Sequence, residues 1–142
     1  MLDWLAQREG VRLGLLTGNY EPIARLKLKR AGIGWAFPPG QGAFGSDAED
    51  RTALPAIARR RAGTPHAPHP RQATIVIGDT PRDIACARAD GLRCVAVASG
   101  PFSSEALMDA DTVARDAAEL PGILRALGVG ICAGTVGRGA RR

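Results

Sequence analysis

Aromatic residues are scarce in this chain of 142 residues, at 4% of the sequence, although hydrophobic residues make up 45%. A globular core must therefore be built from Leu, Ile, Val and Ala. No apolar run approaches the length of a membrane span. The first residues, MLDWLAQREGVR, lack the basic and then apolar blocks of a signal peptide. We therefore expect a globular domain in the cytoplasm, with no membrane among its partners.

Cysteine is also scarce, and its spacing excludes a disulfide framework. The three cysteines, Cys86, Cys94 and Cys132, are odd in number and form no C-x-x-C pair. Reduced, mostly buried thiols are the simplest interpretation, and they agree with a cytoplasmic location.

Basic residues exceed acidic ones, giving a net charge of +5 and a pI near 9.9. The basic residues cluster at 25–30, 59–61 and 138–142. No aromatics are interleaved and no nucleic-acid motif is present, so solvated helix faces and a polar tail are the first interpretation. Attraction of an anionic small substrate is the second. We expect no nucleic-acid partner.

The most informative stretch is 74–91, TIVIGDTPRDIACARADG. Its β-branched start, 74–77, is typical of a buried strand in a parallel sheet. Thr80 can cap a helix whose first turn accommodates Pro81, and Gly91 ends that helix.

Asp79 therefore lies at the carboxyl end of a strand, with Asp83 one helical turn away. Two carboxylates beside a helix N-terminus offer the hard oxygen ligands that Mg²⁺ prefers. The structural alternative is that both are helix-capping carboxylates.

Strand and helix patterns alternate through the rest of the chain. We expect helices at 2–9, 20–31 (with Ile23 and Leu26 in the core), 51–62, 103–108 and 117–127, strands at 11–16, 35–37, 93–98 and 112–113, and a Gly-rich loop at 38–50. This order predicts an α/β fold, a Rossmann-like three-layer arrangement around a parallel sheet. Residues 1–127 would form the domain, and the Gly/Arg-rich tail 128–142 is expected to be disordered.

Parallel sheets bind ligands at the carboxyl ends of their strands. At the first of these ends, Thr17 offers a hydroxyl, and Gly18 and Asn19 offer backbone N–H groups beside a helix N-terminus, which favours a phosphate. Arg51 opens another helix and could neutralise the same phosphate. Alternatively, Thr17 is only a turn residue and Arg51 only a surface ion pair, in which case Lys27 replaces Arg51.

These motifs resemble those of the haloacid dehalogenase (HAD) superfamily, close to its phosphoglycolate-phosphatase-like members. LGLLTGN at 13–19 is similar to the second family motif, and GDTPRD at 78–83 to the fourth, GDxxxD. Arg51 in DRTALPAIA stands where the third motif has its Lys or Arg. The resemblance covers residues 1–127, in the order and spacing of the family.

The resemblance implies a Mg²⁺-dependent phosphatase that acts on a small phosphorylated metabolite. Thr17 would bind the phosphate, with the backbone of Asn19 assisting, and Arg51 would stabilise the transferred group. Asp79 would bind Mg²⁺ directly, and Asp83 would support the metal site.

The first motif of the family, D-x-D-x-T or D-x-D-x-V after a hydrophobic strand, is not found near the N-terminus. The only D-x-D-x-V is 109–113, which follows a helical pattern and comes after the fourth motif. We therefore expect that the chain lacks the family's first strand and cap domain. That strand would lie between 11–16 and 74–78, so its absence would leave two unpaired edges, through which self-association is plausible.

Two hypotheses follow. The chain represents a phosphatase that is inactive by itself for lack of the nucleophilic Asp, or it is a non-catalytic α/β domain that binds phosphate or a partner. A response-regulator receiver is a third and weaker alternative, because that fold needs an acidic cluster at its first strand and a late Lys, and no Lys follows Lys29.

Overall fold

The computed structural model describes residues 1–129. Its helices and strands are α1 (Leu2–Ala6), β1 (Leu16–Thr17), α2 (Glu21–Arg30), β2 (Ala43–Phe44), α3 (Leu54–Ala62), β3 (Ile75–Gly78), α4 (Pro81–Ala89), β4 (Arg93–Val97), β5 (Thr112–Ala114) and α5 (Leu120–Ala126). Short 3-10 turns lie at Gly34–Ala36, Arg51–Ala53, Arg71–Ala73 and Glu105–Leu107. Within residues 1–129, no helix is long and apolar enough to cross a membrane. The predicted tail beyond Val129, with Cys132, lies outside the described residues.

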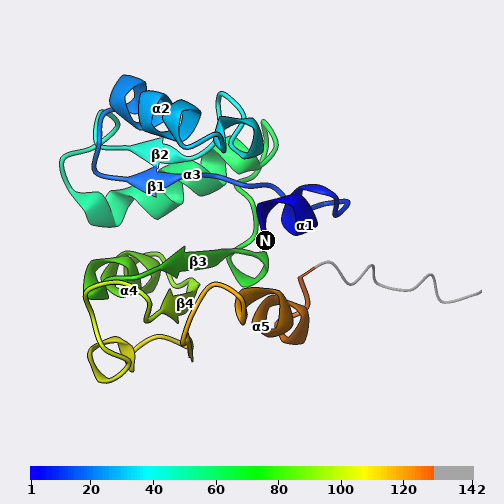
Figure 1. Cartoon of the computed structure of the whole chain (residues 1–142). Helices are drawn as coiled ribbons and strands as arrows, with labels where there is room; N and C mark the ends of the chain where they lie inside the picture. The colour runs from blue at the N-terminus through cyan, green and yellow to red at the C-terminus, as the bar shows by residue number, and fades with distance from the viewer. Residues whose placement is uncertain (130–142) are drawn as a thin grey trace, which may run out of the picture.

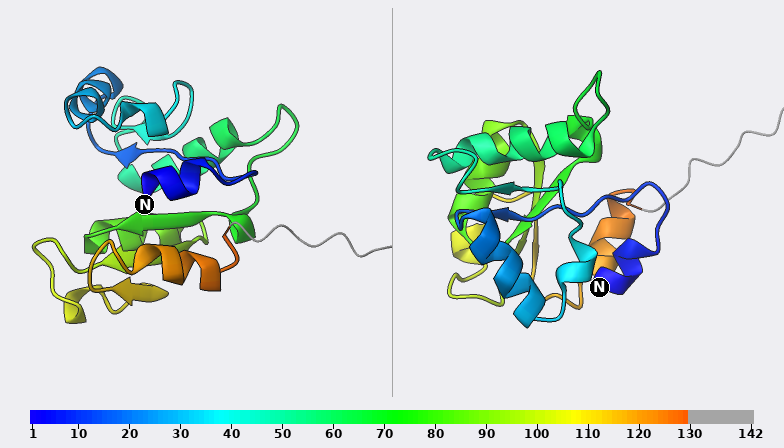
Figure 2. Two further views of the ribbon diagram at one scale, coloured as in Figure 1. Left: turned by 45° about the vertical axis from the view of Figure 1, so that its right-hand side comes forward. Right: turned by 90° about the horizontal axis from the view of Figure 1, so that it is seen from above.

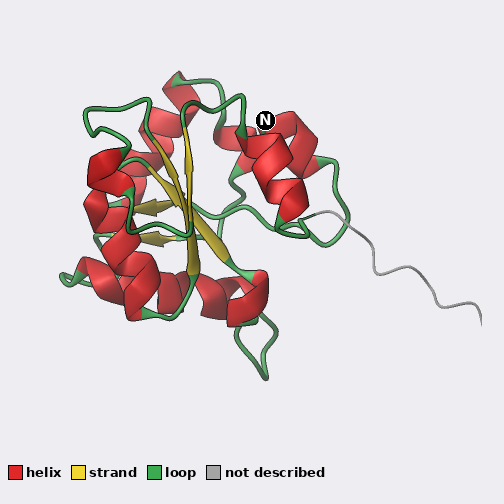
Figure 3. Cartoon of the chain, turned by 90° about the horizontal axis from the view of Figure 1, so that it is seen from below, coloured by secondary structure: helices red, strands yellow, loops and turns green. Residues whose placement is uncertain are grey.

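The strands form the middle of three layers (Figures 2 and 3). Helices α3 and α4 cover one face, and α1, α2 and α5 cover the other. All strand pairings within the two sheets are parallel. The expected three-layer α/β fold with parallel strands is therefore confirmed.

The middle layer consists of separate pieces, β1–β2 and β3–β4–β5. Strands β1 and β3 face each other and run in the same direction, as Figure 1 shows. Within the described residues, β1 pairs with β2 alone and β3 with β4 alone. The unpaired edges expected between 11–16 and 74–78 are thus present.

The core is mostly aliphatic, as the composition predicts, although Phe44 is also fully buried. One cluster joins β3 and β4 to α4, through Val76, Cys94 and Ile84 among others. A second joins β4 and β5 to α5, through Val95 and Leu120 among others. Cys86 and Cys94 are both buried, as expected.

Several boundaries differ from the predictions around β1. Of the strand expected at 11–16, only Leu16 continues into a ladder, because β2 offers a partner only two residues long. Trp35 and Ala36 lie in the 3-10 turn Gly34–Ala36, and Phe37 follows it as the C-cap, so 35–37 do not form a strand. The prolines that follow supply no donor to a ladder. The strand lies instead at Ala43–Phe44, within the expected loop.

Helix α2 also packs on a different face from the one expected. Ile23 and Leu26 are 51% and 50% exposed. Its buried residues are Ala24 and Leu28, which are spaced i, i+4 and therefore share one face. Helix α2 contacts β2 and the 3-10 turn Gly34–Ala36. These contacts leave the side with Ile23 and Leu26 uncovered.

Candidate functional site

The turns that follow the strands meet at the carboxyl edge of the middle layer. The turn after β2 packs closely on the turn after β1, because a Cβ added at Gly45 would lie 2.0 Å from the Gly18 carbonyl oxygen. The turn after β4 packs on the turn after β3, because a Cβ added at Gly100 would lie 2.8 Å from Asp79 Oδ2. Glycine is needed at Gly45, where a Cβ would meet the backbone of the other turn. At Gly100 the nearest atom is the end of the exposed Asp79 side chain, which can move aside.

Thr17 is held in the first of these turns. Its Oγ1 accepts hydrogen bonds from the backbone N–H of Asn19 at 3.1 Å and from Asn19 Nδ2 at 3.0 Å. The Asn19 carbonyl in turn accepts from the N–H of Gly45 at 2.9 Å. The Thr17 hydroxyl keeps its own proton, which it can donate to an anionic oxygen. The Asn19 N–H, in contrast, is used inside the turn.

Arg51 lies between the Thr17 turn and Asp83. Asp50 caps the 3-10 turn that Arg51 opens, accepting from the Thr52 N–H at 2.9 Å. Arg51 Nη2 donates to Asp83 Oδ1 at 2.7 Å, and a Cβ added at Gly18 would lie 3.5 Å from Arg51 Nη1. Burial lowers the pKa of Arg51, but the hydrogen bond and the charge of Asp83 outweigh it and hold this pKa above its ordinary value.

Asp83 organises the start of α4. Its Oδ2 accepts from the backbone N–H groups of Asp79 and Thr80, at 3.2 and 3.1 Å, and from Thr80 Oγ1 at 2.8 Å. Thr80 Oγ1 accepts from the Asp83 N–H, which completes a capping box. Both carboxylate oxygens of Asp83 are therefore engaged within the chain, and this residue positions its neighbours.

Asp79 is the exposed carboxylate of this edge, and Gly100 leaves room for it. Mg²⁺ in proteins is held by one or two carboxylates, several waters and substrate phosphates. Asp79 fits the role of that carboxylate, and Asp83 fits a supporting role because its oxygens are engaged. Among residues 1–129, no three His, Cys, Asp or Glu side chains form a ready-made metal cluster.

Lys27 reaches the same edge. Its Nζ donates to Asn19 Oδ1 at 3.3 Å, from the last turn of α2. The sequence offered Lys27 as a substitute for Arg51, but the structure places both cations at the Thr17 turn. Two cations beside a hydroxyl give this edge the charge that a phosphate requires.

The D-x-D-x-V stretch lies elsewhere. Asp111 Oδ2 accepts from the Cys94 N–H at 2.7 Å and pairs with Arg88 at 3.2 Å. The Cys94 N–H hydrogen bond is the main cause that lowers the pKa of Asp111. Because Asp111 precedes β5, it lies at the amino edge of the sheet, opposite Asp79. The position of Asp109 and Asp111 agrees with the rejection of this stretch as a nucleophile motif.

Two arginines of the 59–61 cluster are not the solvated residues that the sequence predicts. Arg59 is 7% exposed and pairs with Asp90 at 2.6 Å. Arg61 pairs with Asp47 at 2.6 Å, and this hydrogen bond lowers the pKa of Asp47. One signal was available for Arg59: it follows the buried Pro55 by four residues and so shares its helix face.

The middle of the chain is similar to a known protein family. Residues 51–120 match a family model described as HAD-hydrolase-like. The matched segment contains Arg51, Asp79 and Asp83, and the Thr17 turn precedes it. No curated protein matches the chain. The match supports a HAD-like hydrolase domain in this chain.

Proposed function

We propose that this chain, in which residues 51–120 match the HAD-like hydrolases, forms the phosphate- and metal-binding part of a Mg²⁺-dependent phosphatase. The observation that carries the proposal is the position of Arg51. Its guanidinium bonds to Asp83 on one side and approaches Gly18 of the Thr17 turn on the other. One cation thereby joins the proposed phosphate site to the proposed metal site.

In this proposal, Thr17 donates its hydroxyl proton to a phosphate oxygen, and the backbone of Gly18 and Asn19 contributes to the same site. The Asn19 N–H would have to turn from Thr17 Oγ1 to the phosphate. Arg51 neutralises charge on the transferred group, which is the main task of a protein in phosphoryl transfer. Lys27 adds positive charge beside the turn.

Mg²⁺, when bound, would neutralise phosphate charge as a Lewis acid. Asp79 would hold it, because this carboxylate is exposed at the edge. Asp83 would keep Arg51 and the start of α4 in place through its hydrogen bonds. The substrate would be a small phosphorylated metabolite, of the phosphoglycolate-like class that the sequence resemblance suggests.

The family attacks the phosphate with an Asp carboxylate of its first motif, which this sequence does not contain near its N-terminus. Asp109 and Asp111, the only D-x-D pair, belong to the opposite edge of the sheet. We therefore expect this chain by itself to bind phosphate without hydrolysing phosphate esters. The second candidate function, a non-catalytic phosphate- or partner-binding domain, shares the same edge and needs no nucleophile.

The test is hydrolysis of an aryl phosphate by the purified chain, with Mg²⁺ and with a chelator, alongside calorimetric titration with inorganic phosphate. We expect phosphate binding that weakens in Arg51→Gln, no change in Arg115→Gln, which removes an exposed cation elsewhere, and no turnover.

Mg²⁺-dependent turnover that disappears in both Asp79→Asn and Asp109→Asn would contradict the expected inactivity and make Asp109 the nucleophile. Equal phosphate binding by the wild type and Arg51→Gln would contradict the assigned site. Phosphate binding that is independent of Mg²⁺ and of Asp79 would favour the non-catalytic alternative.

A further inference from the structure

Helix α2 presents a row of apolar side chains to the outside of the molecule. Tyr20, Ile23 and Leu26 are 63%, 51% and 50% exposed, and their spacing by three places them along one row of the helix surface. Trp35 is 56% exposed and lies in the 3-10 turn Gly34–Ala36, which contacts α2. We call these four residues the α2 patch.

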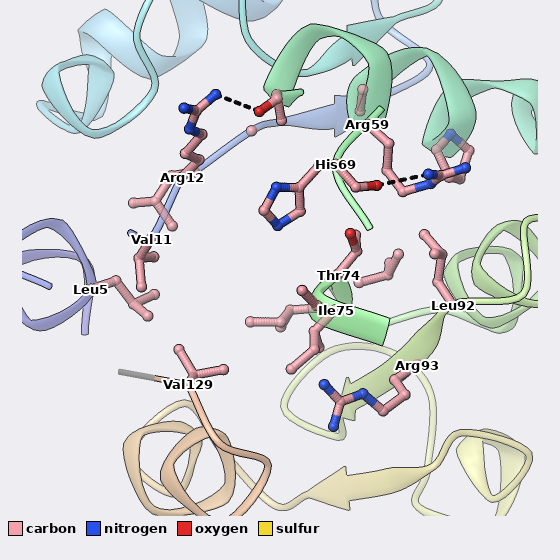
Figure 4. Close-up of a pocket in the computed structure, with 18 of the residues that line it drawn as sticks. Leu5, Val11, Arg12, Arg59, His69, Thr74, Ile75, Leu92, Arg93 and Val129 are labelled. Carbon is pink, nitrogen blue, oxygen red and sulfur yellow. Dashed lines mark hydrogen bonds between the residues drawn. The ribbon is translucent and has the colours of Figure 1, made fainter. Parts of the chain in front are cut away.

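The α2 patch is a concentration of exposed apolar surface rather than a scatter of single residues. Among residues 1–129, eight large apolar residues are exposed, and half of them belong to this patch. Figure 2 shows α2 on the outside of its layer. None of the four residues lines the groove between β1 and β3, whose walls carry Val11 and Ile75 (Figure 4). An outward apolar patch of this kind marks a site of interaction.

Positive charge gathers at one end of the patch. Lys27, Lys29 and Arg30 lie in the last turn of α2. Among residues 1–129, Lys29 and Arg30 take part in no ion pair. The one acidic residue of the helix, Glu21, is bonded to Arg25 at 3.1 Å. Helix α2 therefore offers no carboxylate of its own to balance the cations beside the patch.

The direction of the apolar row indicates the kind of surface that fits it. Rows of residues spaced by three run obliquely, at about 45° to the helix axis. Such a ridge packs into the groove between i, i+4 rows of a second helix, which then crosses the first at about 20°. A flat bilayer contacts a stripe that runs along a helix, so it fits an oblique ridge less well.

We propose that the α2 patch binds an acidic amphipathic helix of another protein. Apolar residues of that helix, spaced i, i+4, cover Ile23 and Leu26, and its carboxylates pair with Lys29 and Arg30. Acidic residues are favoured in the first turns of a helix, so the partner helix runs antiparallel to α2 and places these turns beside the basic last turn. The apolar contacts supply affinity, and the charges supply specificity and orientation.

Charge disfavours the two occupants that this sequence itself could supply. A second copy would place α2 against α2, and each α2 has four basic residues and one acidic residue. Residues 130–142 contain three arginines and no Asp or Glu. Neither of these occupants brings the carboxylates that Lys29 and Arg30 lack.

The test titrates the full chain calorimetrically with a synthetic helical peptide, the striped peptide, which carries Leu in an i, i+4 stripe and Glu in its N-terminal half. It is about 18 residues long, because shorter isolated helices are marginal in water. One control peptide has the same composition in scrambled order, and a second has Lys in place of each Glu. We expect binding of the striped peptide alone.

Variants of the chain locate the binding surface. Leu26→Ser should weaken binding of the striped peptide by about tenfold, because it removes an apolar contact. Lys29→Gln combined with Arg30→Gln should weaken it by about fivefold in low salt and by less in high salt. Met108→Ser is the control: Met108 is 72% exposed outside the patch, so its replacement should have no effect. Circular dichroism checks that the variants fold.

Equal affinity for the striped and scrambled peptides, or no binding of either, would overturn the proposal. So would a wild-type dimer in sedimentation that Leu26→Ser dissociates, since the occupant would then be a second copy. Binding to anionic vesicles that Leu26→Ser abolishes would make a lipid surface the occupant. A chain ending at Val129 that binds the striped peptide more tightly than the full chain would make residues 130–142 the occupant.

Discussion

Arg59 and Asp90 form a buried ion pair that joins α3 to the end of α4. Arg59 Nε lies 2.6 Å from Asp90 Oδ2, Nη2 lies 3.1 Å from Oδ1, and the side chains are 8% and 6% exposed. Arg71 donates to the same carboxylate at 3.0 Å. Because β1 and β3 share no ladder, this pair matters as a polar link between α3 and α4, which pack behind the two pieces of the sheet.

Asp90→Asn should lower the free energy of unfolding by about 3 kcal/mol at pH 7, since it leaves the buried charge of Arg59 without its partner. Urea denaturation measures the change. Arg115→Gln breaks an exposed pair with Glu119 and serves as the control, with an expected loss below about 1 kcal/mol. Equal effects of the two substitutions would mean that the Arg59–Asp90 pair does not hold α3 against α4.

The same pair predicts how stability depends on pH. The Arg59 hydrogen bonds are the main cause that lowers the pKa of Asp90 in the folded chain. In the unfolded chain, Asp90 is protonated as the pH falls below ~3.9, whereas in the folded chain it stays ionised to a lower pH. Its contribution to the free energy of unfolding is therefore complete above pH ~3.9 and is lost as the pH falls through the lower folded pKa. The difference in unfolding free energy between the wild type and Asp90→Asn should therefore shrink in acid. A difference that stays constant from neutral pH to pH ~2 would contradict this assignment.

Gly78→Ala should disrupt the site, because the added Cβ would lie 2.3 Å from Asp83 Cβ. Asp83 would have to move, and with it the Arg51 ion pair and the cap of α4. Gly122→Ala in α5 is the matched control: its Cβ meets nothing within 4 Å, so it should stabilise the chain by about 0.5–1 kcal/mol. Thermal denaturation distinguishes the two, and a Gly78→Ala variant as stable as the wild type would be inconsistent with this packing.

Asp79→Asn should weaken the binding of Mg²⁺ by at least about tenfold, because it removes the exposed carboxylate proposed as the metal ligand. Isothermal titration with MgCl₂ measures the affinity. Asp109→Asn removes an equal charge at the amino edge of the sheet and should leave the affinity unchanged. If both variants bind Mg²⁺ as the wild type does, the metal site is not at Asp79.

The elements around β3 could be predicted from the sequence because their causes are local. A β-branched run, the Gly78 stop and the Thr80 cap each act within a few residues, and the structure has β3 and α4 within one residue of the expected limits. The capping box in particular follows from the T-x-x-D spacing of Thr80 and Asp83.

The elements around β1 and the partner of Arg59 could not be predicted, because their causes are distant. The ladder of β1 ends where the short β2 ends, so its own apolar pattern does not set its length. Arg59 and Asp90 are 31 positions apart. The spacing of Arg59 from Pro55 places it on the buried face of α3, but that spacing does not identify Asp90 as its partner. Partners at such separations depend on how the helices pack on the sheet.

The gap between β1 and β3, a groove of about 530 Å³, lies inside the three layers, and this position affects how readily the chain can aggregate. An unpaired strand edge can form a ladder with the edge of another sheet, and proteins prevent this with charged residues, proline or a covering helix. Here the inner edges of β1 and β3 lie between two layers of helices, α3 and α4 on one side and α1 and α5 on the other (Figure 2). An incoming sheet would collide with these layers, whereas an isolated strand would not. The fold can therefore keep the inner edges of β1 and β3 unpaired without forming fibres through them.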